Sequence, residues 1–243
     1  MRKRGPICLA LLMALALLLL AGCGEMAEAP TDRYETRDNG DGTCTITAYE
    51  GSGSEVLIPE EIDGLTVTAI EGTVFAHNQS ITSVVVPEGV TDIGTQAFIG
   101  CTKLRLVFLP TTLAAFEDYA FSECTALTEI AIPAAVTRIG SGAFESCTSL
   151  TSVSIPGTVE TVDAWAFKDC ESLREVTIEE GVITIGEGAF SGCTDLRSAI
   201  LPETVDSLGE RAFEGCENLI FSVRSGSPAE AYAMENGFGC EAY

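Results

Sequence analysis

Apolar and polar positions recur along most of this chain with one fixed period. The phrase AFESCTSL at residues 143–150 returns as AFIGCTKL, AFSECTAL, AFKDCESL, AFSGCTDL and AFEGCENL, each copy 23 residues from the last. A fixed period of this length is typical of a solenoid, in which equivalent apolar positions of neighbouring coils stack on one another. The recurring phenylalanines are Phe98, Phe121, Phe144, Phe167, Phe190 and Phe213. The pattern therefore predicts stacked coils rather than one compact core.

Each repeat divides into three short parts. Ile130 and Ile132 are two residues apart, which is the period of a strand. Pro133 should end that strand, because proline cannot donate a hydrogen bond to a ladder. Val136 and Ile139 then follow at three-residue steps, which indicates a turn-like return. The AF…C…L phrase has apolar residues one turn apart and fits a short turn or helical turn.

The whole pattern, LxxVxIPxxVxxIGxxAFxxCxxL, resembles the BspA-like leucine-rich repeat family from about Asp38 to the C-terminus. The resemblance implies an α/β-type repeat: a right-handed leucine-rich-repeat solenoid with a parallel β-sheet on one face and short turns or helical turns on the other. It also implies a cell-surface location. Some members of the family act as adhesins. The sequence departs from the pattern at Phe116, Glu117, Asp163 and Glu179, where we expect altered local turns.

The N-terminus predicts an exported protein. A basic start precedes an apolar run from Ile7 to Leu20, which is too short for a comfortable transmembrane helix and has the flanks of a secretory signal. The segment Leu20–Cys23 resembles a bacterial lipobox, which implies a lipoprotein signal peptide at 1–22 and a lipid-modified Cys23 at the start of a polar tether, 23–34. We therefore expect an extracytoplasmic protein anchored to a bacterial membrane, facing the cell surface or the periplasm. An ordinary signal peptide cleaved nearby is the alternative.

The solenoid is expected to fill residues 35–226, with distinct segments at its two ends. At the entry, DNGDG at 38–42 precedes an alternating run and predicts a hairpin turn. A calcium loop is disfavoured because Gly40 occupies the third ligand position. At the exit, Ser227-Pro228-Ala229-Glu230 has the form of a capping box with proline at the first helical position. Residues 227–243 should therefore form a helical cap over the open end of the core.

Charge restricts the partners. The chain carries 36 acidic and 13 basic residues, a net charge of −23, and loss of the three basic residues in 1–22 would make it about −26. Nucleic acid is excluded as a partner because phosphate binding needs a basic surface. The acidic residues are scattered rather than clustered, which favours a solvated exterior. A preference for cationic or calcium-bridged partners is the sharper alternative.

The cysteines predict structure rather than chemistry. Six of the ten occupy one repeat position with apolar neighbours, where a thiol behaves as a small hydrophobe. We expect them to be free, buried thiols, and we expect Cys44 and Cys240 to lie at opposite ends of the stack. No CxxC pair is present, so no metal site or cofactor is predicted. The column consists of Cys101, Cys124, Cys147, Cys170, Cys193 and Cys216.

The sequence offers a binding surface but no catalytic group. His77 is the only histidine, and its neighbours are polar, so we expect no enzyme. On the predicted strands, Val85, Leu106 and Phe108 should point outward beside Arg105. Exposed apolar clusters with polar rims often mark interaction sites. A solvated sheet that merely uses β-favouring residues is the alternative.

These patterns lead to one functional hypothesis and one alternative. The first is a monomeric, membrane-anchored module for protein or glycoprotein recognition, or adhesion, through the sheet face. The alternative is a structural scaffold of the cell envelope with no soluble partner.

Overall fold

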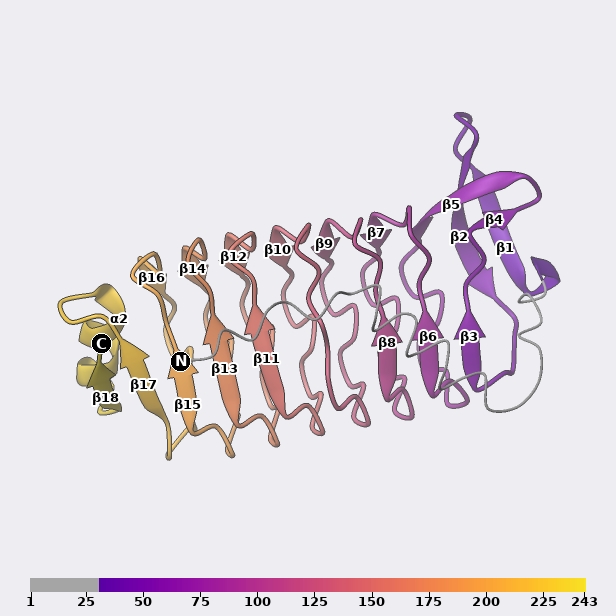
Figure 1. Cartoon of the computed structure of the whole chain (residues 1–243). Helices are drawn as coiled ribbons and strands as arrows, with labels where there is room; N and C mark the ends of the chain where they lie inside the picture. Colours follow the sequence, from indigo (N-terminus) through magenta and orange to yellow (C-terminus); the bar gives the residue numbers. More distant parts are fainter. Residues whose placement is uncertain (1–30) are drawn as a thin grey trace, which may run out of the picture.

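The computed structural model describes residues 31–243, which form one elongated stack of coils (Figure 1). It begins with a 3-10 helix, η1 (Thr31–Arg33), and an antiparallel hairpin of β1 (Tyr34–Asp38) and β2 (Thr43–Tyr49). Tyr34 is buried in the hydrophobic core, so the fold starts inside the segment 23–34 that we expected to be a tether. The predicted signal peptide and Cys23 lie outside the described residues.

Two hairpins form the entry to the solenoid and stand out from the coils at its N-terminal end (Figure 1). The predicted hairpin turn between β1 and β2 is confirmed, and the Asp38 carboxylate accepts a hydrogen bond from the Gly40 N–H at 2.7 Å. The second hairpin joins β4 (Glu61–Ile62) to β5 (Leu65–Ile70) through Asp63 and Gly64, which have φ of 53° and 80°. An Asp-Gly pair with two positive φ angles suits a two-residue hairpin loop.

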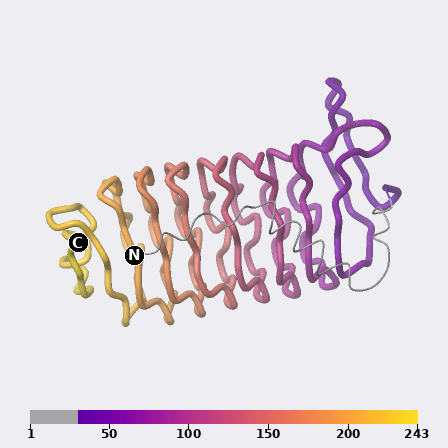
Figure 2. Tube along the Cα trace, viewed as in Figure 1, coloured from indigo at the N-terminus to yellow at the C-terminus, as the bar shows by residue number. Residues whose placement is uncertain are grey.

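The coils carry parallel strands on two faces, where the sequence predicted one. The first face holds β3 (Glu55–Leu57), β6 (Ser83–Val85), β8 (Leu106–Phe108), β11 (Ser152–Ile155), β13 (Glu175–Ile178), β15 (Ser198–Ile200), β17 (Ile220–Val223) and β18 (Gly239–Ala242). The second face holds β7 (Asp92–Ile93), β9 (Ala115–Phe116), β10 (Arg138–Ile139), β12 (Thr161–Val162), β14 (Thr184–Ile185) and β16 (Ser207–Leu208). The return segment is therefore a strand too, and its register follows the 23-residue step. Figure 2 shows the resulting even spacing of the coils.

The first face is not one continuous sheet. It divides into a three-stranded sheet, β3–β6–β8, and a five-stranded sheet, β11–β13–β15–β17–β18. Residues 129–131, which lie between them, form no strand. On the second face, β9, β10 and β12 pair without interruption across the same place.

The third side of each coil is a chain of tight turns. Of the two structures expected for the AF…C…L phrase, a short turn or a helical turn, the structure has the short turns. Phe98 N–H donates to the Ala120 carbonyl of the next coil at 2.8 Å, and Cys101 N–H donates back to the Phe98 carbonyl at 3.2 Å. Two residues of each turn, four apart, have positive φ, such as Trp165 and Asp169. Among residues 31–243 the single α-helix is α2 (Pro228–Glu235).

The centre of the solenoid is a column of stacked phenylalanine rings. Ring centroids of neighbouring coils lie between 4.7 and 5.6 Å apart, with nearly parallel planes. Tyr49 packs on Phe75 at the first end, and Tyr232 meets Phe213 edge-on at the last. Aromatic rings bury the most apolar area per residue, so this column is the main stabilising feature of the stack.

The exit has the predicted helix and an additional strand. Ser227 is the N-cap of α2, and its hydroxyl accepts from the Glu230 N–H at 3.2 Å. The Glu230 carboxylate accepts from the Gly226 N–H at 2.6 Å, a one-residue variation on the capping box. After Gly237, with φ of 78°, the chain adds β18 in parallel to β17. The segment 227–243 is therefore a helix and a strand, not a helix alone.

Candidate binding face

The three-stranded sheet aligns the outward side chains of neighbouring coils. Parallel pairing places Leu57, Val85 and Phe108 in one outward row, and Glu55, Ser83 and Leu106 in the next. Of the residues between them, Val56 and Val84 point inward and are buried, and Val107 is partly buried against the core. The structure thus brings Val85, Leu106 and Phe108 together. Leu106 is 38% exposed, and Leu57, Val85 and Phe108 are half-buried.

Leu57 belongs to this surface but was missed by the repeat pattern. It lies 28 residues before Val85, because the β4–β5 hairpin inserts five residues into the first coil. Counting 23 residues back from Val85 therefore reaches the hairpin instead of the strand. The alternating segment Glu55–Ile58 was the available signal, since Val56 and Ile58 are both buried and Leu57 lies between them. We call the surface formed by Leu57, Val85, Arg105, Leu106 and Phe108 the candidate binding face.

Two exposed cations border the candidate binding face. Arg105 immediately precedes β8, and Lys103 lies two residues earlier. Neither forms an ion pair with any residue in 31–243, whereas most other cations there do. In a chain with a net charge of −23, these two side chains bring positive charge to the edge of a sheet that also carries the exposed Glu55.

On the second face, the cation Arg138 is paired with carboxylates of the solenoid itself. Arg138 Nη2 lies 2.5 Å from an Asp163 carboxylate oxygen and 3.1 Å from one of Asp118, and Arg138 Nη1 lies 3.6 Å from Glu117. Glu117 and Asp163 occupy the position that is usually glycine, as at Gly140 between them. A Cβ at Gly140 would lie 2.7 Å from the Phe116 carbonyl oxygen. The two departures from the repeat pattern therefore hold Arg138 between neighbouring coils.

The thiol column, which comprises the six repeat cysteines, lies inside the turn side. Each thiol is buried and donates to the carbonyl of the phenylalanine 26 residues earlier, as Cys147 does to Phe121 at 3.2 Å. The other five contacts span 3.0–3.3 Å. Each phenylalanine carbonyl thus accepts from a backbone N–H of its own coil and a thiol of the next. No disulfide joins cysteines within the described part of the chain.

Burial keeps these thiols protonated. It raises the pKa of Cys101 from its usual 9.0 to about 11 and that of Cys216 to about 12. The pKa values of Cys124 and Cys147 are also raised well above the ordinary thiol value, mainly by burial. Since the thiolate is the reactive form, the column is chemically inert in the folded chain. Cys44 and Cys240 lie in β2 and β18, at opposite ends of the stack.

The remaining candidate chemistry is sparse. His77 is exposed on the turn side, where its ring covers Gly100. Within residues 31–243 no cluster of three or more His, Cys, Asp or Glu side chains could hold a metal ion. The helices in that range are also too short or too polar to span a membrane.

Comparisons with known proteins match the fold. Residues 68–197 and 161–225 match the family model of the BspA type leucine rich repeat region, with six copies. A Treponema (T. pallidum) leucine-rich repeat protein, TpLRR, superposes with a TM-score of 0.77 at 31% identity, covering 89% of this chain and 100% of that one. A leucine-rich repeat protein from Bacteroides ovatus gives a TM-score of 0.70 at 27% identity, covering 81% of this chain and 55% of that one. Among curated proteins the search found no match.

Proposed function

The chain belongs to the BspA-type leucine-rich repeat family, and on this premise we propose that it is a non-enzymatic binding module for a protein or glycoprotein. The candidate binding face is the contact surface. We further propose that Cys23 carries a lipid that holds the module on the outer side of a bacterial membrane. The expected solenoid and family resemblance are confirmed, and a solenoid sheet is a common surface for recognising proteins.

The observation that carries the proposal is the apolar row of the three-stranded sheet. Leu57, Val85 and Phe108 are in register on neighbouring strands, and Leu106 is exposed beside them. The unpaired Arg105 lies at the edge of the same patch. Aromatic side chains and arginine are enriched at protein interfaces, and Phe108 and Arg105 are of these types. A partner that presents apolar side chains next to a carboxylate would match this surface.

The test compares two double variants of the full chain. Leu106→Ser/Phe108→Ser removes the apolar part of the candidate binding face. Ile200→Ser/Ile220→Ser makes the same kind of change on the five-stranded sheet, where these residues are 40% and 45% exposed. Each protein is immobilised and exposed to purified matrix glycoproteins and mucins, and circular dichroism checks that each variant is folded.

We expect the parent and the Ile200→Ser/Ile220→Ser variant to bind the same ligand with similar affinity. The Leu106→Ser/Phe108→Ser variant should bind it at least about tenfold more weakly, the loss typical of a central contact. Unchanged binding by this variant would place the contact surface elsewhere. A parent that binds nothing in the panel would favour the structural scaffold of the envelope.

A further inference from the structure

The turn side of the solenoid carries a ladder of backbone hydrogen bonds that stops at the last coil. On each of six coils, three N–H groups at alternate residues donate to carbonyls of the next coil. In the sixth, the bonds run from Gly188 to Glu210 at 3.0 Å, from Phe190 to Ala212 at 2.7 Å and from Gly192 to Glu214 at 2.7 Å. The three equivalent donors of the last coil belong to Arg211, Phe213 and Gly215. No backbone carbonyl in residues 31–243 accepts from any of them.

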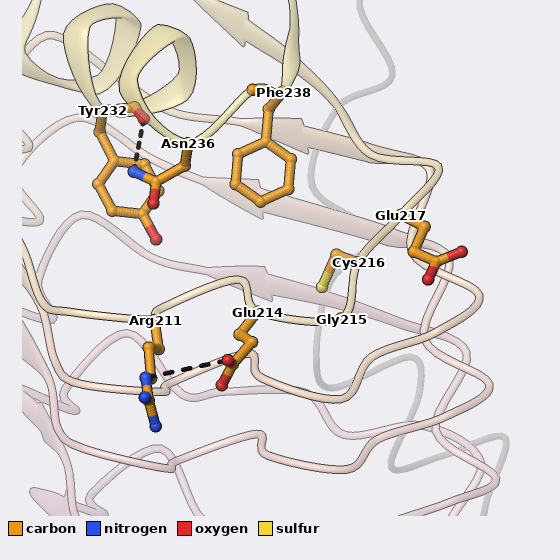
Figure 3. A pocket seen from close by; sticks show the side chains of 9 residues that line it. Arg211, Glu214, Gly215, Cys216, Glu217, Tyr232, Asn236 and Phe238 are labelled. Carbon is orange, nitrogen blue, oxygen red and sulfur yellow. Dashed lines mark hydrogen bonds and ion pairs between the residues drawn. The ribbon is translucent and has the colours of Figure 1, made fainter.

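Two of these donors border a cavity of about 470 Å³ between the last turn and the C-terminal cap. Arg211 and Gly215 line it from the turn, and Tyr232, Asn236 and Phe238 line it from the cap. Figure 3 shows the rings of Tyr232 and Phe238 reaching from the cap toward the turn. The α-helix therefore covers the core without replacing the missing coil on the turn side.

The middle donor has a partial substitute. Burial raises the pKa of the Tyr232 phenol, and hydrogen bonding from the backbone N–H groups of Phe213 and Ala212 opposes that rise. The Tyr232 ring meets that of Phe213 edge-on, with centroids 6.3 Å apart. Arg211 and Gly215 retain outward N–H groups four residues apart, the same separation at which Glu210 and Glu214 accept on the coil before.

The charge around the cavity favours a neutral hydrogen-bond acceptor over an anionic one. Its rim holds the carboxylates of Glu214 and Glu217 against the single guanidinium of Arg211, which lies 3.9 Å from Glu214. A free carboxylate or phosphate would be repelled by this rim and by the net charge of the chain, −23. A neutral peptide carbonyl is not repelled, and a basic side chain beside it would be attracted.

We propose that this cavity binds an extended, basic peptide segment of a partner protein. Two of its carbonyls, four residues apart, accept from the N–H groups of Arg211 and Gly215, and its Lys or Arg side chains face Glu214 and Glu217. The peptide continues the backbone ladder of the turn side, in the way that added strands extend sheet edges. This site is at the C-terminal end of the solenoid and does not depend on the candidate binding face.

The test is a titration of the full, ¹⁵N-labelled chain with the capped heptapeptide acetyl-(Val-Lys)₃-Val-amide, followed by amide NMR. We expect a saturable downfield shift of the Arg211 and Gly215 amide protons, because these groups gain a carbonyl partner. The equivalent Gly188 and Gly192 amides should not move. Glu214→Gln/Glu217→Gln should weaken binding by about fivefold. The matched variant Glu171→Gln/Glu180→Gln, which changes two exposed carboxylates elsewhere, should leave it unchanged.

Three results would overturn the proposal. The first is no saturable binding at millimolar peptide. The second is binding that leaves the Arg211 and Gly215 amides unmoved, which would indicate attraction to the acidic surface alone. The third is a larger shift of the same amides with sodium acetate than with the peptide, which would identify an anion site instead.

Discussion

The two sheets on the first face share a backbone but present different surfaces. The three-stranded sheet turns Leu57, Val85 and Phe108 outward in one row. The five-stranded sheet turns out mainly serine, threonine and glutamate, as at Ser152 and Ser154 of β11. Strands of the same kind therefore form with small polar residues outward. Large apolar residues are not needed there for folding, which favours a role in recognition over a simple β-preference.

The inward residues explain why the backbone is nevertheless the same. Val84 under the first sheet and Val153 under the second are both buried at the same repeat position. Stacking of like side chains on neighbouring coils stabilises each coil, whatever the strand shows to solvent. The outward positions are thereby left free to differ along the solenoid.

The boundary between the two sheets coincides with an unusual core residue. Phe116 stands where other coils have isoleucine, valine or leucine, and its ring lies 6.1 Å from that of Phe121 and 5.0 Å from that of Phe144. The spacing between Phe121 and Phe144 is 5.6 Å, the widest of the stack. The Thr128 N–H to Arg105 carbonyl distance is also long, at 3.5 Å, beside the strandless residues 129–131. The extra ring volume of Phe116 accounts for a local spreading of the coils.

The largest expected effect is loss of stability at alkaline pH, which should affect both sheets together because the thiol column runs through the coils that carry both. The folded-state pKa values of the thiols are raised above 9.0, so the unfolded chain ionises first as pH rises. Their stabilising contribution is complete below about pH 9 and is lost above it. Six such thiols lower the free energy of unfolding by up to ~8 kcal/mol per pH unit in that range. Urea midpoints measured from pH 7 to 10.5 would show this fall.

Cys147→Ser is the matched control for that series. Serine keeps a donor for the Phe121 carbonyl but does not ionise, so the pH slope should fall by about a sixth. A stability that stays level between pH 9 and 10.5 would mean that the thiols are not buried in the folded chain.

The next effect concerns the phenylalanine stack at the boundary. Phe144→Ala should cost ~3–5 kcal/mol, because the ring is fully buried and lies between those of Phe121 and Phe167. Leu106→Ser, on the exposed surface of the three-stranded sheet, should cost under about 1 kcal/mol. Urea unfolding of both variants measures the difference. A cost below about 1 kcal/mol for Phe144→Ala would show that the ring is not part of the packed core.

The sequence was sufficient to predict the surroundings of a residue wherever its position in the repeat or in a capping motif determines them. The 23-residue period placed Phe144 and Cys147 in the core, and the capping residues placed Ser227 at the start of α2. The two-residue strands of the second face were not predicted, because such short segments show no alternation and their pairing comes from neighbouring coils. The strand β18, with the polar sequence GCEA, forms because β17 offers it an edge. Leu57 was not predicted, because the β4–β5 hairpin interrupts the 23-residue period before Val85.

The smallest expected effect on stability comes from a substitution that should join the two sheets of the first face. Phe116→Ile restores the residue common in this column and should change stability by less than about 1.5 kcal/mol, since the volume change is modest. With the ring removed, the distance between Phe121 and Phe144 should shorten toward the 5.0–5.2 Å of most neighbouring pairs. Residues 129–131 should then pair with β8 and β11, and their amide protons should exchange more slowly.

The reverse change provides the control. Ile139→Phe places the same ring one coil further along, beneath β11, and should cost ~1–3 kcal/mol by overpacking. It should also loosen the pairing of β11 with β13, seen as faster amide exchange at residues 152–155. If Phe116→Ile leaves exchange at 129–131 as fast as before, the boundary arises from the outward residues Glu129 and Ala131 and not from the core. The outward residues would then explain both the different surfaces of the two sheets and the break in backbone pairing between them.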